Sequence, residues 1–236
     1  MDKKSKQFFR SLVDFLSEVL GSNSEVVFHL RDKNGFYIES IKNGHISGRT
    51  TSSPITGLAL EMIKNEAYTD TNYLVNYRGV SKKGDFLKSS TYFIKNSDGY
   101  LEGLICINTN VSDYIAVKHL LEELSSFRPI DEEPIAIEQA KEYSLKLNDN
   151  VMDEHQNKID DKIEYFSHSI EEIIYNIIPE EKLRDKSLTP SDRKEIVSTL
   201  NDSGIFSMKG SVPIVADIMQ VSIPTVYRYI KEVKNN

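Results

Sequence analysis

The C-terminal part of the chain carries the side chains whose type and spacing point most clearly to chemistry. Residues 211–233 predict two short helices with a tight bend at residues 220–222. This pattern is typical of a helix-turn-helix, whose second helix presents its outer side to base edges and phosphates in the major groove. We expect that side to carry six contact residues: Ser222, Pro224, Thr225, Tyr227, Arg228 and Lys231.

Local signals at the helix ends agree with this prediction. We expect Ser211 to cap the first helix, with Pro213 in its opening turn, and Ser222 to cap the second. The apolar stripes predicted to be buried are Val215, Ala216 and Met219 in the first helix and Val226, Ile230 and Val233 in the second. Gln220 stands in the bend where a Gly is often found, so an ordinary helical hairpin is the alternative interpretation.

A third helix is predicted just upstream of this pair. Thr189 and Asp192 have the spacing of a capping box, and Gly204 provides a stop. Between them, Ile196, Val197 and Leu200 form an apolar stripe. The third helix supplies the core that a two-helix DNA reader needs.

The distribution of charge supports double-stranded DNA as a partner, although the whole chain is acidic. The formal net charge is −7, but the residues from Lys182 onward hold 9 Lys+Arg and 6 Asp+Glu, a net charge of +3, against 20 and 30 in the rest. An excess of +3 gives a single copy only a weak grip on phosphates. We therefore expect a homodimer or a larger homo-oligomer that places two or more copies on one site.

Sequence signals for catalysis are missing. The chain has no P-loop, no Rossmann glycine pattern, no Gly-x-Ser-x-Gly elbow and no Cys pair for metal, and its five His residues are scattered. We expect no catalytic residue, no metal site and no cofactor, and hence no enzyme.

Length, hydropathy and cysteine content indicate a globular protein. The 236 residues are 39% hydrophobic, which is enough for a buried core. The single cysteine, Cys106, excludes an internal disulfide and suits a reducing compartment. No stretch approaches the ~20 apolar residues of a membrane span, and the charged N-terminal residues do not resemble a signal peptide. We expect a cytoplasmic protein without a membrane partner.

The first half of the chain predicts an α+β fold. An amphipathic helix over residues 5–21 precedes two hairpins, formed by strands 25–30 with 36–41 and 87–95 with 100–108, each with an Asn-Gly or Asp-Gly turn signal. The other predicted elements are helices over 54–64 and 111–127 and a strand over 72–78. Antiparallel hairpins grouped between helices favour α+β over an alternating α/β arrangement.

Several short motifs, met in order, make this half similar to the YheO-like PAS family. They are Asn43-Gly44-His45-Ile46-Ser47-Gly48-Arg49, Asn76-Tyr77, Leu87-Lys88-Ser89-Ser90-Thr91, and Gly103 with Cys106-Ile107-Asn108. The resemblance covers about residues 8–115 and 188–234. It implies a PAS-like antiparallel sheet with flanking helices, joined to a C-terminal helix-turn-helix in a bacterial transcriptional regulator.

A PAS-like sheet can enclose a small-molecule effector among a few polar side chains. At the positions that carry the resemblance, Arg49 is the natural partner for a carboxylate or phosphate, and His45 and Asn108 would orient it. The full set of expected ligand contacts is His45, Arg49, Tyr77, Ser89, Ser90, Tyr92 and Asn108. Each also has a structural explanation, such as turn chemistry, an ion pair or a solvent-facing hydroxyl.

An acidic segment separates the two regions. Ile159, Ile163, Phe166, Ile170, Ile173 and Ile177 are spaced 4-3-4-3-4 and predict a helix of about five turns that ends before Pro179. Such a helix packs on its own chain or is shared between subunits. The predicted organisation is a PAS-like sensor over 1–128, an acidic connector with an oligomerisation helix over 129–180, and a helix-turn-helix domain over 181–236.

The sequence thus favours a DNA-binding transcriptional regulator whose PAS-like domain senses a small molecule or mediates oligomerisation. Two alternatives stay open. One is a protein-interaction adaptor with a PAS-like docking module and no sequence-specific DNA binding, and the other is a small-molecule binding protein that signals to a partner. A steep dependence of DNA affinity on salt would exclude the adaptor.

Overall fold

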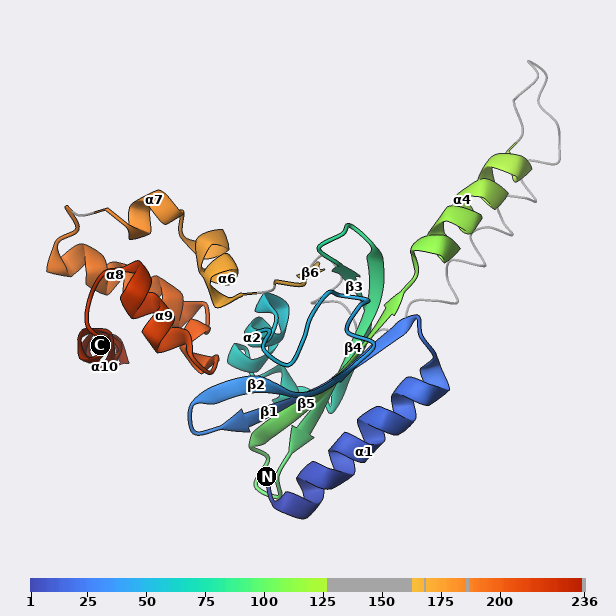
Figure 1. The fold of residues 1–236 in the computed structure, drawn as a ribbon, viewed down its shortest axis with the longest axis horizontal. Helices are drawn as coiled ribbons and strands as arrows, with labels where there is room; N and C mark the ends of the chain where they lie inside the picture. Colours follow the sequence, from blue (N-terminus) through green and yellow to red (C-terminus); the bar gives the residue numbers. More distant parts are fainter. Residues whose placement is uncertain (127–162, 168, 186, 235–236) are drawn as a thin grey trace. The chain divides into compact units, whose positions relative to one another are not determined.

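A computed structural model describes residues 1–126, 163–167, 169–185 and 187–234 of the chain (Figure 1). They fall into two compact units, one formed by residues 1–110 with the described residues from 163 onward, and the other containing residues 111–126. The first unit contains a β-sheet with helices packed on it and a C-terminal group of helices. The predicted α+β class is confirmed.

Six strands form one mixed sheet. In the order in which they lie side by side, they are β2 (Gly35–Lys42), β1 (Ser24–Asp32), β5 (Leu101–Asn110), β4 (Phe86–Lys95), β3 (Tyr73–Val80) and β6 (Glu164–Tyr165). The first five pair antiparallel, as the predicted hairpins require, whereas β6 pairs parallel to β3. The sequence predicts five of these strands and misses β6.

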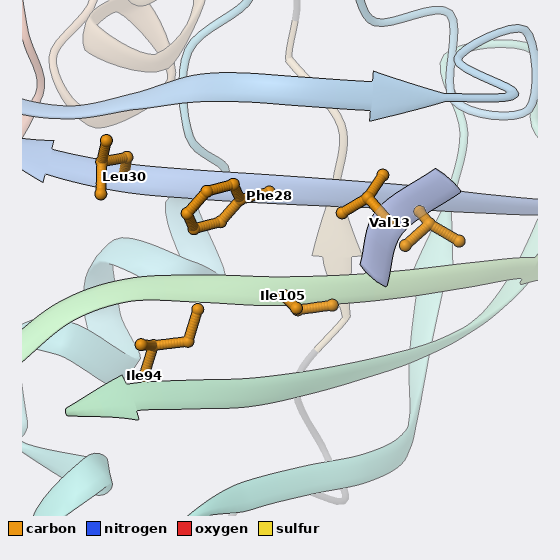
Figure 2. Packing of buried hydrophobic residues seen from close by; sticks show 6 residues of the cluster. Val13, Phe28, Leu30, Ile94 and Ile105 are labelled. Atoms are coloured by element: carbon orange, nitrogen blue, oxygen red, sulfur yellow. The ribbon is translucent and has the colours of Figure 1, made fainter. Parts of the chain in front are cut away.

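Helix α1 (Lys3–Leu20) covers one face of the sheet. It begins at Asp2, whose side chain accepts two backbone N–H bonds, and it ends at the predicted stop, Gly21. Val13 of this helix is fully buried in a cluster with Val26, Phe28, Leu30, Ile94 and Ile105 (Figure 2). The apolar stripe of α1 is wider than this contact, because Phe8, Phe15 and Val19 are 61–63% exposed.

On the other face of the sheet, Ile46 of the loop that follows β2 packs beside Leu87 of β4. Helix α2 (Gly57–Lys64) contacts β6 and is followed by the short helix α3 (Ala67–Asp70). Thr56 caps α2, with its hydroxyl oxygen 3.3 Å from the N–H of Ala59 that it accepts. The helix therefore begins after the predicted start at Pro54, because a side chain that accepts this N–H bond fixes the first turn.

The predicted helix over residues 159–177 is confirmed only in its second half, where helix α6 runs over Ile170–Ile177. Residues 163–167 are not helical, and Glu164 and Tyr165 form a strand instead. Ser169 starts α6 by accepting the N–H of Glu172 at 3.1 Å. The regular apolar spacing was misleading because Phe166 is buried by packing on the sheet, beside Ile46 and Leu87. Ile159 lies outside the described residues.

The C-terminal residues 170–234, which we call the head, form a group of short helices. After α6 these are α7 (Glu180–Leu183), α8 (Pro190–Asp202), the 3₁₀ helix η1 (Ile205–Ser207), α9 (Ser211–Ile218) and α10 (Ile223–Lys234). The capping box of Thr189 and Asp192 opens α8 as predicted. All the predicted stripe residues of α8, α9 and α10 are buried except Val233, which is half-buried.

One predicted helix cap is wrong. Gly210, not Ser211, precedes α9, in a left-handed conformation. Ser211 is the first residue of the helix, and its buried hydroxyl donates to the carbonyl oxygen of Met208 at 3.0 Å.

Helix α4 (Ser112–Ser125) belongs to the second unit and matches the helix predicted over 111–127. None of its residues is buried, and its exposed apolar side chains are Tyr114, Val117, Leu120, Leu121 and Leu124. No helix in the described part of the chain is both long and apolar enough to cross a membrane.

Candidate functional site

A row of polar side chains crosses the face of the sheet opposite α1. The strand register places Glu25 of β1 beside Asn108 of β5, Asn108 beside Ser89 of β4, and Ser89 beside Tyr77 of β3. None of the four is more than 7% exposed. We call these residues, with the polar side chains that contact them, the polar row. Burying such groups costs stability unless they are hydrogen-bonded, so the arrangement requires an explanation.

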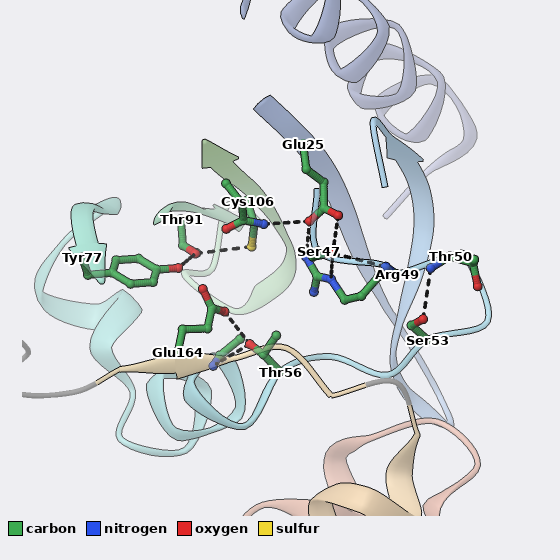
Figure 3. A network of polar contacts seen from close by, with 12 residues as sticks. Glu25, Ser47, Arg49, Thr50, Ser53, Thr56, Tyr77, Thr91, Cys106 and Glu164 are labelled. Atoms are coloured by element: carbon green, nitrogen blue, oxygen red, sulfur yellow. Dashed lines mark hydrogen bonds and ion pairs between the residues drawn. The ribbon is translucent and has the colours of Figure 1, made fainter. Parts of the chain in front are cut away.

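Glu25 is the centre of a charged network at one end of the polar row (Figure 3). Its Oε1 accepts hydrogen bonds from Arg49 Nη2 at 2.6 Å and from Asn108 Nδ2 at 2.8 Å. Its Oε2 accepts a hydrogen bond from the Ser47 hydroxyl, and Arg49 Nε donates to the same hydroxyl oxygen at 3.1 Å. The Arg49 and Glu25 side chains are 1% and 0% exposed. Such an ion pair is tolerated in a core only with these additional hydrogen bonds.

The loop after β2 is shaped to bring Ser47 and Arg49 into this network. Asn43 has a left-handed backbone, with φ of 55°, and its side-chain amide donates to the carbonyl oxygen of Ser24 at 2.9 Å. Gly44 passes under Arg49, and a Cβ on it would lie 2.4 Å from the Arg49 carbonyl oxygen. The Asn-Gly pair at this loop is therefore the turn that positions the buried guanidinium.

Glu164 of β6 brings a second carboxyl group to the polar row (Figure 3). Its Oε1 accepts a hydrogen bond from the Thr56 hydroxyl at 2.6 Å. The residue is 3% exposed, and its Oε2 has no hydrogen-bond partner among the described residues. Burial raises the pKa of Glu164 above its ordinary 4.5, although the Thr56 hydrogen bond and the Arg49 charge act in the opposite direction. The site therefore favours the neutral acid more than water does.

A chain of neutral groups lies next to Glu164. The Tyr77 hydroxyl is 2.8 Å from Thr91 Oγ1, which is 3.3 Å from Cys106 Sγ. Burial raises the pKa of the Cys106 thiol to about 12 and that of Tyr77 well above 10, and the Glu164 charge adds to both shifts. A thiol with so high a pKa is a hydrogen-bonding group rather than a nucleophile.

Three further buried atoms on this face lack a hydrogen-bond partner within the described part of the chain: His29 Nδ1, Ser89 Oγ and Asn108 Oδ1. Burial, followed by the positive charge of Arg49, lowers the pKa of His29 to about 3, so its imidazole is neutral. An unpaired buried polar atom costs about 1–3 kcal/mol. Several in one place are typical of a functional site rather than of an ordinary core.

The structure brings together four of the seven predicted ligand residues: Arg49, Tyr77, Ser89 and Asn108. The other three lie apart from them. His45 and Tyr92 are exposed, and Ser90 is half-buried and accepts the N–H of Asn76 at 3.1 Å. Ser90 and Tyr92 differ from Ser89 in strand phase, so their side chains belong to the opposite face of the sheet.

The expected ligand contacts omit six polar residues of this region: Glu25, His29, Ser47, Thr56, Thr91 and Glu164. Of these, Ser47 and Thr91 stand in the motifs that carry the family resemblance, whereas the other four were missed. Glu25 did leave a signal, because it is a charged residue at the start of an otherwise apolar strand. Glu164 left none, since it lies 108 residues from its partner Thr56 in a strand of two residues. Among the residues that the structure describes, no group of three His, Cys, Asp or Glu side chains could hold a metal ion.

In the head, α9 and α10 form the predicted pair of helices with a bend between them. Gln220 adopts a left-handed conformation there, with φ of 51°, and so fills the position where Gly is common. Ser222 caps α10 as predicted, since its Oγ accepts the N–H of Thr225 at 3.3 Å. Val226, Tyr229 and Ile230 hold the helix in place through their buried side chains.

The outer side of α10 and the bend carry all six predicted DNA contacts. Five of them are exposed, and Thr225 is half-buried. Arg228 Nε lies 3.9 Å from Glu232 Oε1, and its guanidinium lies 5.3 Å from the centre of the Tyr229 ring. Surface contacts of this kind are worth little, so Arg228 can exchange them for another partner.

The chain matches two families of domains and is similar over nearly its whole length to several bacterial proteins. Residues 2–126 match the YheO-like PAS domain, and residues 169–231 match an HTH domain. The chain is 28% identical over 232 residues to YheO, an uncharacterised protein of Escherichia coli strain K12, which covers 96% of this chain and 84% of that protein. It is 23% identical over 231 residues to the transcriptional regulator DauR of Pseudomonas aeruginosa, which covers 98% and 95%.

An uncharacterised protein of Haemophilus influenzae is 26% identical over 230 residues, which cover 96% of this chain and 90% of that protein. The match to the PAS domain alone spans more than half of the chain. The resemblance carried by the loop of Asn43 to Arg49 and by the strand motifs is thereby confirmed. This chain belongs to the YheO-like PAS family and joins its PAS domain to a C-terminal HTH domain.

Proposed function

We propose that this chain is a DNA-binding transcriptional regulator whose PAS domain senses a small molecule. The observation that carries the proposal is the exposed outer side of α10, which presents Thr225, Tyr227 and Arg228 while Val226 and Ile230 anchor the helix. The match to an HTH domain and the similarity to a protein named as a transcriptional regulator support it.

Each group on α10 has a distinct task in this proposal. Arg228 is suited to a bidentate contact with guanine, and Lys231 to a phosphate. Ser222 and Thr225 lie at the N-terminal end of α10, where backbone N–H groups and hydroxyls can approach a phosphate. The head therefore combines one base-reading group with several positioning contacts.

The test is a comparison of two cationic residues on the same helix. After selection of the preferred DNA site, Arg228→Ala should weaken binding to it by about 1–3 kcal/mol and binding to random DNA only slightly. Lys234→Ala, at the far end of α10, should affect both DNAs alike and weakly. Fluorescence anisotropy at several salt concentrations measures both. A DNA affinity that does not change with salt concentration, or equal losses of affinity in the two variants, would favour the adaptor function instead.

The polar row supports the sensing part of the proposal. It places an ion pair, a second carboxyl group and four unpaired buried polar atoms on one face of the PAS sheet. A ligand that pairs those atoms gains free energy that the unliganded protein lacks. For the ligand to change DNA binding, it must bind one of two states of the chain more tightly than the other.

The proposal requires a homodimer, because the positive charge of one head is too small for tight binding to DNA phosphates. Phe8, Phe15 and Val19 follow one another at helical spacing along the exposed side of α1. A second copy of the chain is the proposed occupant of this side. Sedimentation of the full chain should give a dimer, and Phe8→Glu with Phe15→Glu should give a monomer. A wild-type monomer at micromolar concentration would contradict this assembly.

A further inference from the structure

The segment over residues 163–167, which we call the strap, lies outside both matched domains and yet completes the PAS sheet. The matches end at residue 126 and resume at residue 169. Between them, Glu164 and Tyr165 pair with Gly79 and Val80 of β3, and Phe166 is buried beside Leu87. The strap thus completes the sheet from outside the residues that the PAS match covers.

Alternation along the strap separates two environments. Its outer residues, Ile163 and the exposed Tyr165, line a cleft of about 450 Å³; Ser167 also lines it but is only 7% exposed. Its inner residues, Glu164 and Phe166, are buried on the side of the polar row. The strap therefore forms the partition between an open cleft and the buried polar groups, so that its departure would open the polar row to the cleft.

The inner side of the strap offers the domain a carboxyl group and an aromatic ring. The carboxyl accepts the Thr56 hydrogen bond, and the Phe166 ring lies 4.7 Å from the Arg49 guanidinium carbon. Residues two apart in a strand are separated by about 7 Å. The PAS domain thus already binds a carboxyl group and an aromatic ring at about this spacing, and both belong to its own strap.

Gly79 of β3 is the position that makes room for the strap. A Cβ there would lie 2.9 Å from Ser89 Oγ and 3.1 Å from Phe166 Cε2. Ser89 Oγ and Glu164 Oε2 both lack a hydrogen bond of normal geometry among the described residues, although Ser89 lies near enough to Glu164 to lower the pKa of its carboxyl group. Because Glu164 is held by the backbone of the strap, its side chain has limited reach. The strap therefore fills the site but leaves these two polar atoms without a good hydrogen bond.

We propose that the strap is a tethered ligand in a site for a small aromatic carboxylic acid, and that a free acid of this class displaces it. The free acid would take the Thr56 bond, lay its ring on Arg49 and accept the Ser89 hydroxyl that Glu164 leaves without a good hydrogen bond. The strap ends two residues before α6, so its release frees the connection to the head. This inference rests on the proposed sensing function and names its ligand class.

Hydrogen exchange of the full chain, followed by mass spectrometry, tests the displacement without DNA. The probe is 4-phenylbutyrate, with hexanoate, an acid that lacks the ring, as control. 4-Phenylbutyrate should speed exchange of the strap amides by about tenfold or more when it is well above its dissociation constant, and it should slow exchange in β4. Hexanoate at the same concentration should do neither, because it has no ring to lie on Arg49. If 4-phenylbutyrate leaves the strap protected up to its solubility limit, the proposal is overturned.

A matched pair of variants separates a tethered ligand from a merely structural strand. Glu164→Ala removes the Thr56 hydrogen bond, so strap exchange should rise about tenfold and the acid should bind more tightly. Tyr165→Ala, on the outer side of the same strap, should leave both properties near the wild type. Equal responses of the two variants contradict the proposal, and so does a response of Glu164→Ala to hexanoate as strong as its response to 4-phenylbutyrate.

Glu164→Gln provides the measurement if Glu164→Ala does not fold, because its amide oxygen still accepts from Thr56. The acid must release the strap of this variant as well, and no release overturns the proposal. DNA affinity is measured separately through Arg228. If DNA binding is intact but the acid does not release the strap, the proposed ligand class is wrong. If the acid releases the strap but the chain does not bind DNA, the proposed regulator function is wrong.

Discussion

The PAS domain and the head of this chain are stabilised by different kinds of core. The PAS domain buries an ion pair, a second carboxyl group and a neutral imidazole on one face of its sheet. The head buries apolar side chains such as Leu200, Val226 and Ile230, and it leaves Arg228 and Lys231 exposed. An apolar core gives a rigid support at little cost, whereas buried charge is expensive. Under the proposed function, buried polar groups suit the PAS domain to the recognition of a ligand, and the apolar core suits the head to the rigid presentation of a surface.

The largest expected effect comes from breaking the buried ion pair. Arg49→Met leaves the Glu25 carboxylate without its charged partner, so we expect a loss of about 3–5 kcal/mol in the free energy of unfolding. Arg78→Met, at an exposed position of β3, should change it by less than about 0.5 kcal/mol. Urea denaturation measures both. Similar losses for the two variants would mean that the PAS core does not depend on its charges.

The corresponding change in the head is the removal of apolar volume. Leu200 is fully buried, so Leu200→Ala should cost about 3 kcal/mol through lost burial and an unfilled cavity. Leu120→Ala, on the exposed side of α4, serves as the control. If Leu200→Ala cost no more stability than Leu120→Ala, the head would not be the rigid support that the comparison assumes.

His29 sharpens the comparison through pH. Its folded pKa of about 3 lies below the ordinary 6.5, so below pH 6.5 the unfolded chain binds a proton that the folded chain does not. Wild-type stability should therefore fall as the pH drops from 6.5 towards 3, by about 1.4 kcal/mol per pH unit. The His29→Leu variant does not have this dependence. The difference in the free energy of unfolding between His29→Leu and the wild type should therefore shift by about 2 kcal/mol in favour of the variant between pH 7.5 and pH 5.

The raised pKa of Glu164 acts in the opposite sense, since it lowers stability as the pH rises above 4.5. That contribution is common to both proteins and cancels in their difference. His45→Leu, at an exposed position, is the matched control. Parallel pH curves for wild type and His29→Leu would show that the buried imidazole titrates as in water.

The smallest effect concerns the bend of the head. Ser222→Ala removes the cap of α10 and should cost about 1 kcal/mol of stability. Ser222→Asn retains an acceptor for the Thr225 N–H and should keep most of that stability. Thermal unfolding of the two variants decides whether the cap, rather than the mere presence of a polar residue, fixes this end of the helix.

Most of the fold could be predicted because its elements are long and periodic. The hairpin turns and the Gly21 stop are local signals, and the structure has them where they were predicted. The failures have non-local causes. The strap was predicted as part of a helix because Phe166 falls on a helical spacing, while pairing with β3 and the Ser169 cap decide its structure.

The candidate site divides in the same way. Arg49 could be found from its loop motif, and Ser222 to Lys231 from the two-helix pattern. His45 and Tyr92 were grouped with Arg49 by closeness in sequence or motif, but turn geometry and strand phase place their side chains elsewhere. Glu25 and Glu164 reach the polar row through strand register and a parallel pairing, neither of which short-range spacing reveals.

The parallel strand Glu164–Tyr165 also decides how this protein can be dissected. A fragment cut where the PAS match stops, at residue 126, would contain every residue of that match and still leave the places of Glu164 and Phe166 vacant. Ile46 and Leu87 would lose an apolar neighbour, and Thr56 would lose its acceptor. The domain boundary given by sequence similarity therefore differs from the boundary given by packing. Experiments on an isolated N-terminal half would examine an incomplete PAS domain.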